Sequence, residues 1–305
     1  MIRLAAFAVA GPLLLAAAQL LPFLGGSTLV FVALAALAST GLTLIMGLGG
    51  QVSLGHAAFY GVGAYGLALL TVKAGWPVPV ALGAGAALAG GLAALLGVAV
   101  LRIQGHFLAM ATLAFGLIWF FFVRGWEPAG ANQGIGGIPA LPLDDDEATF
   151  LALWVVLAGG VLLARNLADS RTGRALRALG ASEAAAGSCG IDVARAKVGV
   201  FVIGAVYAAV AGGLYAMYVT YIAPDAFGLL ASLQFLVIAV VGGLGSPWGA
   251  TVGAVFVAGL TELSRELLPY VVPDAAGSYE LVAYGLALVL VLLVARQGLA
   301  GVAAR

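Results

Sequence analysis

Residues 27–73 read STLVFVALAALASTGLTLIMGLGGQVSLGHAAFYGVGAYGLALLTVK, and they contain two long apolar runs on either side of a glycine-rich break, GLGGQVSLG, at 47–55. Each run is long enough for a helix to cross about 30 Å of hydrocarbon at about 1.5 Å per residue. Two such runs in immediate succession are typical of a polytopic membrane protein. The break cannot be ordinary helix throughout, so we expect an irregular connection there.

The composition of the whole chain agrees with this interpretation. Of the 305 residues, 63% are hydrophobic and only 9% are charged, and the mean hydropathy is +1.14. A soluble domain is typically about 25% charged, so a cytosolic enzyme, a secreted domain and a disordered tail are excluded. The net charge of zero also excludes a nucleic-acid binder. The 45 glycines favour closely packed helices, and we predict an all-α transmembrane bundle in which residues 1–305 form one domain.

Charged residues and proline–glycine punctuation divide the chain into ten apolar segments. These segments are 4–24, 27–48, 55–73, 78–101, 106–123, 149–165, 198–221, 229–243, 249–267 and 280–296. We interpret 4–24 as an uncleaved first helix. A signal peptide is the alternative, because Arg3 precedes the apolar run and three alanines stand at 16–18.

The charged residues between these segments predict the orientation of the chain. Six of the thirteen basic residues lie between 165 and 197, namely Arg165, Arg171, Arg174, Arg177, Arg195 and Lys197. The segment 124–148 has Arg124 as its one basic residue, and its acidic residues are Glu127, Asp144, Asp145, Asp146 and Glu147. Positive segments stay in the cytoplasm, so we expect 166–197 to be cytoplasmic and 124–148 to be periplasmic. Counting spans places both termini in the cytoplasm, where the same rule fits Arg3, Arg296 and Arg305.

A second glycine-rich break, GGLGSPWG, occupies 242–249. Interrupted segments at corresponding places in the two halves of a transporter point to its substrate path. We therefore expect the two breaks to contact substrate, with tight turns between helices as the alternative. The candidate pathway residues are Gly49, Gly50, Gln51, Ser53, Gly55, His56, Gly242, Gly243, Gly245 and Ser246.

The sequence holds no arrangement of side chains that suggests catalysis. No carboxylate pair, metal-ligand cluster or nucleophile–base pair is recognisable, Cys189 is the only cysteine, and neither Lys73 nor Lys197 ends a nucleotide-binding P-loop. His56 and His106 are the two titratable side chains that we expect near the depth of the substrate path. Each is either a hydrogen-bonded structural residue or a functional one. Other charged residues of the spans lie near span ends, where they can reach the interface: Glu262, Arg265, Glu266 and Glu280. We expect no enzyme activity and no metal or cofactor on this chain, with any power from ATP supplied by another chain.

The segment SRTGRALRALGASEAAAGSCGIDVARAKV (170–198) predicts two short helices. Three arginines recur every three residues and share one helical face: Arg171, Arg174 and Arg177. Ser182 and Glu183 suit the start of the second helix, and Gly190 suits its end. A long connection that is both helical and basic indicates docking onto a partner. A positive-inside loop that is merely helical is the alternative.

This segment resembles the cytoplasmic coupling motif of permease subunits in bacterial ABC importers, which seats in a cleft of the ATPase subunit. The matching residues are Glu183, Ala185, Ala186, Gly190 and Ile191. Three further stretches are similar to hallmark stretches of the branched-chain amino acid permeases, specifically of the second of their two related permease subunits: GGQVSLGHAAFYGVGAY (49–65), LRIQGHFLAMATLAF (101–115) and GGLGSPWGATVGA (242–254). Gln104 and Phe107 depart from the family pattern, as do Asn132 and Gln133, and the last change bears on substrate preference.

The resemblance implies a multi-pass permease subunit of the bacterial inner membrane with the ten-helix fold of vitamin- and sugar-importing relatives. Its implied partners are the lipid bilayer, a homologous second permease subunit, two cytoplasmic ATPase subunits that bind ATP and Mg, and a periplasmic substrate-binding protein. The expected cargo is a branched-chain amino acid, moved by alternating access that the ATPases drive through 170–198. Related permeases for urea, short amides or ribose-like sugars are alternatives, as is a stand-alone channel or ion-coupled carrier.

Overall fold

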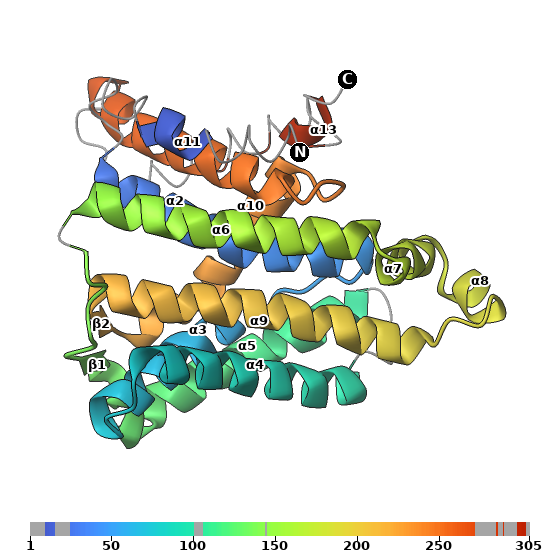
Figure 1. The fold of residues 1–305 in the computed structure, drawn as a ribbon, viewed down its shortest axis with the longest axis horizontal. Helices are drawn as coiled ribbons and strands as arrows, with labels where there is room; N and C mark the ends of the chain where they lie inside the picture. Colours follow the sequence, from blue (N-terminus) through green and yellow to red (C-terminus); the bar gives the residue numbers. More distant parts are fainter. Residues whose placement is uncertain are drawn as a thin grey trace.

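A computed structural model places most of the chain in helices that lie side by side (Figure 1). It describes residues 10–15, 25–100, 106–143, 145–271, 285, 289 and 298–302. The elements are the α-helices α2 (Gly26–Thr43), α3 (His56–Ala68), α4 (Val78–Val100), α5 (His106–Gly125), α6 (Asp146–Asp169), α7 (Arg171–Ala181), α8 (Glu183–Ser188), α9 (Val193–Val219), α10 (Leu229–Gly242), α11 (Gly249–Val271) and α13 (Leu299–Val302). The π-helical turns are η1 (Leu44–Leu48) and η2 (Leu69–Lys73), the 3₁₀ turns are η3 (Glu127–Ala129), η4 (Ala131–Gln133) and η5 (Pro224–Phe227), and the strands are β1 (Ile135–Gly136) and β2 (Tyr221–Ile222).

Six helical segments within the described residues are long and apolar enough to cross a membrane. They are Gly26–Leu48, Val78–Ala99, Phe107–Gly125, Asp146–Asp169, Val193–Val219 and Pro224–Gly242. Large apolar side chains cover their outer faces, such as Leu95 on α4 and Ile118 on α5, which are 70% and 67% exposed. A surface of this kind needs lipid or another membrane chain around it. The predicted all-α, polytopic membrane protein is therefore confirmed.

The predicted segments between 27 and 267 agree with the observed helices to within a few residues. Among the helix starts, α6 begins at Asp146 and α9 at Val193, a few residues before the predicted positions. The first turn of α6 carries acidic residues, which suit its positive end. On α9 the carboxylate of Asp192 accepts a hydrogen bond from the backbone N–H of Arg195 (3.1 Å). Polar residues before the apolar runs thus extend both helices.

Two predicted segments, 4–24 and 280–296, lie largely outside the described residues. Six residues named from the sequence also lie outside the described residues: Arg3, Gln104, Asp144, Glu280, Arg296 and Arg305. The count of ten segments and the cytoplasmic position of both termini therefore stay predictions. His106 begins α5.

Glycine brings the central helices α2, α3 and α9 together through their backbones. A Cβ on Gly63 of α3 would lie 1.9 Å from the carbonyl oxygen of Ala209 on α9, and a Cβ on Gly41 of α2 would lie 2.6 Å from that of Gly204. Any side chain at these points would force the helices apart. The expected close packing is confirmed, and Figure 1 shows α9 running between α6 and α4.

The bundle has two distinct ends, which α6 connects (Figure 1). At one end β1 pairs antiparallel with β2, with Ile135 opposite Ile222. The ammonium of Lys73 donates there to the carbonyl oxygen of Pro128 (2.6 Å), which joins the α3–α4 connection to the segment 124–148. The other end carries α7 and α8. We call the end with β1 and β2 the acidic end and the end with α7 and α8 the basic end.

Candidate functional site

The break between α2 and α3 enters the bundle. After η1, residues 49–55 form an irregular segment that leads to α3 at His56. The His56 ring is fully buried, and its Nε2 donates to the carbonyl oxygen of Ala38 (3.0 Å). Ala38 precedes Leu48 by ten residues, so α3 begins on the order of 15 Å along α2 from the end of η1. The alternative prediction of a tight turn at this break is therefore wrong. His56 was predicted to be either structural or functional, and this hydrogen bond fits the structural role.

Side chains from two other helices hold the N-terminus of α3. The backbone N–H of Leu54 donates to Oγ1 of Thr112 on α5 (3.0 Å), and that of Ala57 donates to Oγ of Ser232 on α10 (2.9 Å). The first N–H groups of a helix have no acceptor within the helix, and burying them without one is costly. The irregular segment 49–55 is therefore tied to α5 and α10. Sequence reasoning missed Thr112 and Ser232 because both lie far from the break along the chain.

The second break is a tight turn at the basic end. Gly243 ends α10 with a φ of +107°, which glycine adopts without steric strain. The turn folds α11 back onto α10, since a Cβ on Gly242 would lie 1.9 Å from the carbonyl oxygen of Gly249. The alternative of a tight turn is thus confirmed for 242–249.

The two breaks meet at the basic end. A Cβ on Gly47 of η1 would lie 2.0 Å from the carbonyl oxygen of Leu244, so the two backbones touch directly. A cavity of about 300 Å³ lies beside this contact, between η1, the ends of α6 and α7, and the turn 243–248. Gly245 and Ser246 line it, whereas the other candidate pathway residues do not.

Serine caps build the two short helices predicted in the connection 170–198. The Ser170 hydroxyl accepts from the N–H of Gly173 (3.1 Å) at the start of α7, and the Ser182 hydroxyl accepts from that of Ala185 (3.3 Å) at the start of α8. Gly190 follows α8 in a left-handed conformation with φ of +81°, as its predicted position at the helix end requires. Both predicted helices are confirmed.

The arginines of α7 lie on an exposed face, but two of them also bind this chain. Nη1 of Arg174 donates to the carbonyl oxygen of Asp169 (3.1 Å), and Nη1 of Arg177 donates to that of Ala168 (2.8 Å). Both carbonyls belong to the last turn of α6, whose negative end favours cations. The two arginines therefore fix α7 against α6, whereas Arg171 is exposed.

The other predicted coupling residues differ in exposure. Ala185 and Gly190 are exposed, Ile191 is half-buried and Ala186 is buried. The N–H of Ile191 donates to the carbonyl oxygen of Ala186 (3.2 Å), which closes the end of α8. Their contact with an ATPase stays a prediction.

An ion pair between a buried ammonium and a half-buried carboxylate joins α8 to α9. Nζ of Lys197 lies 2.5 Å from Oε1 of Glu183, and the Lys197 side chain is only 4% exposed. The carbonyl oxygen of Lys197 accepts from Nε2 of Gln51 (3.4 Å) in the first break. A Cβ on Gly50, whose φ is +63°, would lie 3.0 Å from Cα of Gly180 in α7. The connection 170–198 is thus in direct contact with the segment that enters the bundle.

Sequence reasoning did not assign this role to Lys197. The only signal is a lysine at the start of the apolar run of this helix, with an acidic residue fourteen positions earlier. A buried ammonium requires a partner, and Glu183 supplies it. We call Gln51, Glu183 and Lys197 the basic-end cluster.

A cavity of about 400 Å³ lies between α2, α3, α9, α10 and α11. Its walls are aliphatic and aromatic, and its lining residues include Phe31, Tyr60, Tyr215, Phe235, Ile238 and Val257. Its lining also includes Thr28, Gln234, Glu262 and Arg265. None of the ten candidate pathway residues lines this cavity, and their contact with substrate stays a prediction.

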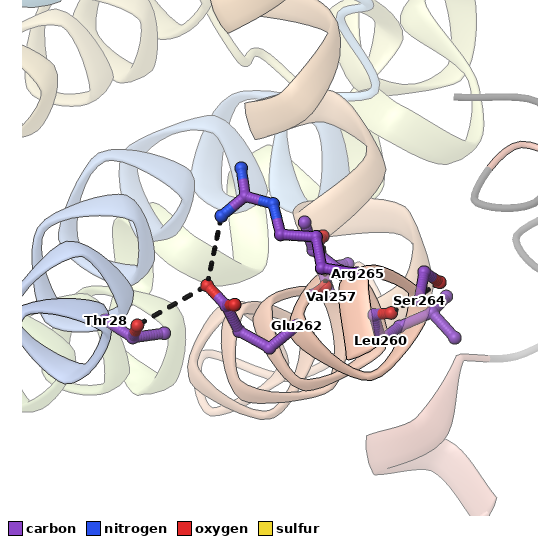
Figure 2. A network of polar contacts seen from close by, with 7 residues as sticks. Thr28, Val257, Leu260, Glu262, Ser264 and Arg265 are labelled. Carbon is purple, nitrogen blue, oxygen red and sulfur yellow. Dashed lines mark hydrogen bonds and ion pairs between the residues drawn. The ribbon is translucent and has the colours of Figure 1, made fainter. Parts of the chain in front are cut away.

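Figure 2 shows the polar network on the wall of this cavity. Oγ1 of Thr28 donates to Oε1 of Glu262 (3.5 Å), and Nη1 of Arg265 lies 3.4 Å from the same oxygen. The Glu262 side chain is 22% exposed and that of Arg265 is 59% exposed. Both residues lie near the end of a predicted span, but their position on one cavity was not predicted from the sequence. Their spacing of three residues on one helix was the available signal.

Comparison with known proteins agrees with the resemblance found in the sequence. The family model described as "Branched-chain amino acid transport system / permease component" matches residues 26–295. The permease protein LivM of the high-affinity branched-chain amino acid transport system is 30% identical in Escherichia coli K12 over 259 residues, which is 75% of this chain and 61% of the relative. LivM of Salmonella typhimurium is 31% identical over 262 residues, again with 75% and 61% coverage.

The companion permease protein LivH is also similar. LivH of Escherichia coli K12 is 27% identical over 290 residues, which is 87% of this chain and 91% of the relative. The chain therefore spans about three fifths of the length of the LivM relatives but most of the length of LivH. No solved protein structure matches the chain.

Proposed function

The chain belongs to the family of branched-chain amino acid permease components, and from this premise we propose that it is a transmembrane permease subunit of a bacterial ATP-driven importer. Its proposed cargo is a branched-chain amino acid that a periplasmic binding protein delivers. The match of the family model over most of the chain supports this function. The similarity to both LivM and LivH supports pairing with a homologous second permease subunit.

The proposed topology has ten membrane segments, cytoplasmic termini and the basic end in the cytoplasm. The distribution of charge supports this orientation, because arginine is concentrated around α7 and acidic residues precede α6. In this orientation α7 and α8 face two cytoplasmic ATPase subunits, which bind ATP and Mg. The segment 124–148 then faces the periplasm.

The observation that carries the mechanism is the contact of α7 and α8 with the first break. A displacement of α8 moves Lys197 through Glu183, and the first break contacts Lys197 through Gln51 and α7 through the close approach of Gly50 to Gly180. Residues 49–55 in turn bind α5 and α10 at the start of α3. ATP-driven movement at the basic end therefore reaches two helices inside the bundle, as alternating access requires.

The test is reconstitution of the chain in proteoliposomes with a LivH-type subunit, the two ATPases and the binding protein. We expect radiolabelled leucine to accumulate only with ATP on the ATPase side, and only when all subunits are present. The chain without ATPases is the control. Uphill leucine uptake by the chain alone, or failure of the ATPases to co-purify with it from native membranes, would contradict the proposal.

A further inference from the structure

We propose that the 400 Å³ cavity is a binding site for a zwitterionic α-amino acid, in which Glu262 binds the α-ammonium group and Arg265 binds the α-carboxylate. This inference rests on the proposed function and names the site at which that function acts. The aliphatic side chain of the substrate would lie on the aromatic and apolar wall.

The cavity has the size and lining that such a ligand needs. Small-molecule sites are typically about 300–1,000 Å³, mostly apolar, with a few polar groups that fix orientation. Here Tyr60, Phe235 and Ile238 supply apolar wall, and the charged pair lies on one side, on α11. A branched-chain amino acid has the same division between an apolar branch and a charged head.

The contacts of Glu262 leave capacity for a ligand. Its two hydrogen-bond distances, 3.5 Å to Thr28 and 3.4 Å to Arg265, exceed the usual 2.7–3.2 Å. Both contacts use Oε1, and among the described residues Oε2 has no hydrogen bond. A carboxylate with an unused oxygen on the wall of an apolar cavity is a polar group that can fix the orientation of a ligand there.

The hydroxyl groups of Thr261 and Ser264, next to the charged pair along the chain, are already used within α11. Thr261 donates to the carbonyl oxygen of Val257 (2.9 Å), and Ser264 donates to that of Leu260 (2.7 Å). The charged pair is therefore the main polar feature of this wall. A guanidinium offers a carboxylate two parallel N–H donors, whereas urea and ribose carry neither of the two charges that the pair would match.

The position of the cavity also suits a substrate site. Thr28 lies in the first turn of α2, and neighbouring Gly26 packs against Asp146 at the start of α6, so this wall is near the acidic end. On the other side, a Cβ on Gly253 would lie 2.1 Å from the carbonyl oxygen of Ile238, so α10 and α11 are closed together there. The cavity thus lies between the acidic end and a closed contact of α10 with α11.

Protection of an introduced cysteine tests the site on the assembled transporter. In a Cys189→Ser background, Ala258→Cys places a thiol on the cavity wall one turn before Glu262. We expect leucine to slow its reaction with a maleimide. Leucinamide, which lacks the carboxylate, and 4-methylpentanoate, which lacks the ammonium group, should each protect more weakly than leucine.

The charge variants assign the two ends of the ligand. Glu262→Gln should raise the half-protecting leucine concentration about tenfold, the loss of roughly one charged hydrogen bond, and leave protection by 4-methylpentanoate unchanged. Arg265→Gln should weaken leucine and leave leucinamide unchanged. The exposed neighbour Glu266→Gln is the matched control and should change neither.

Glu262→Asp keeps the charge with a shorter reach and should shift protection by less than Glu262→Gln, provided that both variants co-purify with the ATPases. Undiminished leucine protection in Glu262→Gln, or no protection in a complex that imports leucine, would overturn the site while leaving the proposed function intact. Absence of ATP-driven leucine import in the unaltered complex would instead contradict the proposed function itself.

Discussion

Removing the carboxylate of Glu183 should loosen α8 from the rest of the chain. In Glu183→Gln the ammonium of Lys197 remains at a position where its side chain is 4% exposed, but it loses its charged partner at 2.5 Å. Breaking a fully buried pair costs about 3–5 kcal/mol. Because Glu183 is 31% exposed, water reaches this pair, and we expect a smaller cost of about 1.5–3 kcal/mol.

Amide hydrogen exchange measures this cost locally. The N–H of Ala186 donates to the carbonyl oxygen of Ser182, the N-cap of α8, and that of Cys189 donates to those of Ala185 and Ala186, so both exchange when α8 opens. A loss of about 1.5–3 kcal/mol corresponds to exchange that is about 10- to 100-fold faster. In the double variant Glu183→Gln/Lys197→Met, exchange should return towards the original rate, since no buried ammonium is then left without a charged partner.

An exposed ion pair in the same region is the matched control. Arg195 lies 3.1 Å from Asp192, but the two side chains are 90% and 52% exposed. Arg195→Gln should therefore change exchange in α8 by at most about threefold. Unchanged exchange in Glu183→Gln, or an equal effect of Arg195→Gln, would refute the reasoning that the buried pair holds α8.

Three further predictions concern the same machinery. Glu183→Lys places two ammonium groups together, so leucine uptake should be lost while the chain still inserts; normal uptake with normal binding-protein-stimulated ATPase activity would contradict a coupling role. Gly243→Val should abolish uptake because a branched residue cannot easily adopt a φ of +107°, whereas Gly91→Val, with open space around it, should retain uptake; unchanged uptake in Gly243→Val would show that the strain is absorbed. Ser232→Ala removes an acceptor at the start of α3 and should lower thermal stability in detergent by about 1 kcal/mol; an unchanged melting temperature would mean that the N–H of Ala57 finds another acceptor.

Hydropathy predicted the helices well because each long apolar run is a local property of the chain. The run predicted at 78–101 is the helix Val78–Val100, and the run at 27–48 is α2 with η1. The caps of α7 and α8 were also predictable, since a capping serine acts on residues only three positions away.

The site was less predictable because it depends on contacts between distant parts of the chain. Thr28 and Glu262 are 234 residues apart, and Leu54 and Thr112 are 58 apart. The pattern of apolar residues along the chain does not indicate that the two residues of either pair lie close together. Both glycine-rich breaks interrupt apolar runs, yet one enters the bundle, where Thr112 on α5 and Ser232 on α10 accept from the backbone at its end, and the other is a tight turn.

The contact between Gly47 and Leu244 has a consequence for motion. Where two stretches of main chain touch without intervening side chains, no interlocking rotamers have to disengage before one stretch slides along the other. Such a backbone contact permits small displacements at little enthalpic cost. A single methyl group at Gly47 would clash with the carbonyl oxygen of Leu244 and prevent them. Glycine at this junction therefore preserves a freedom of movement that a better-packed residue would remove.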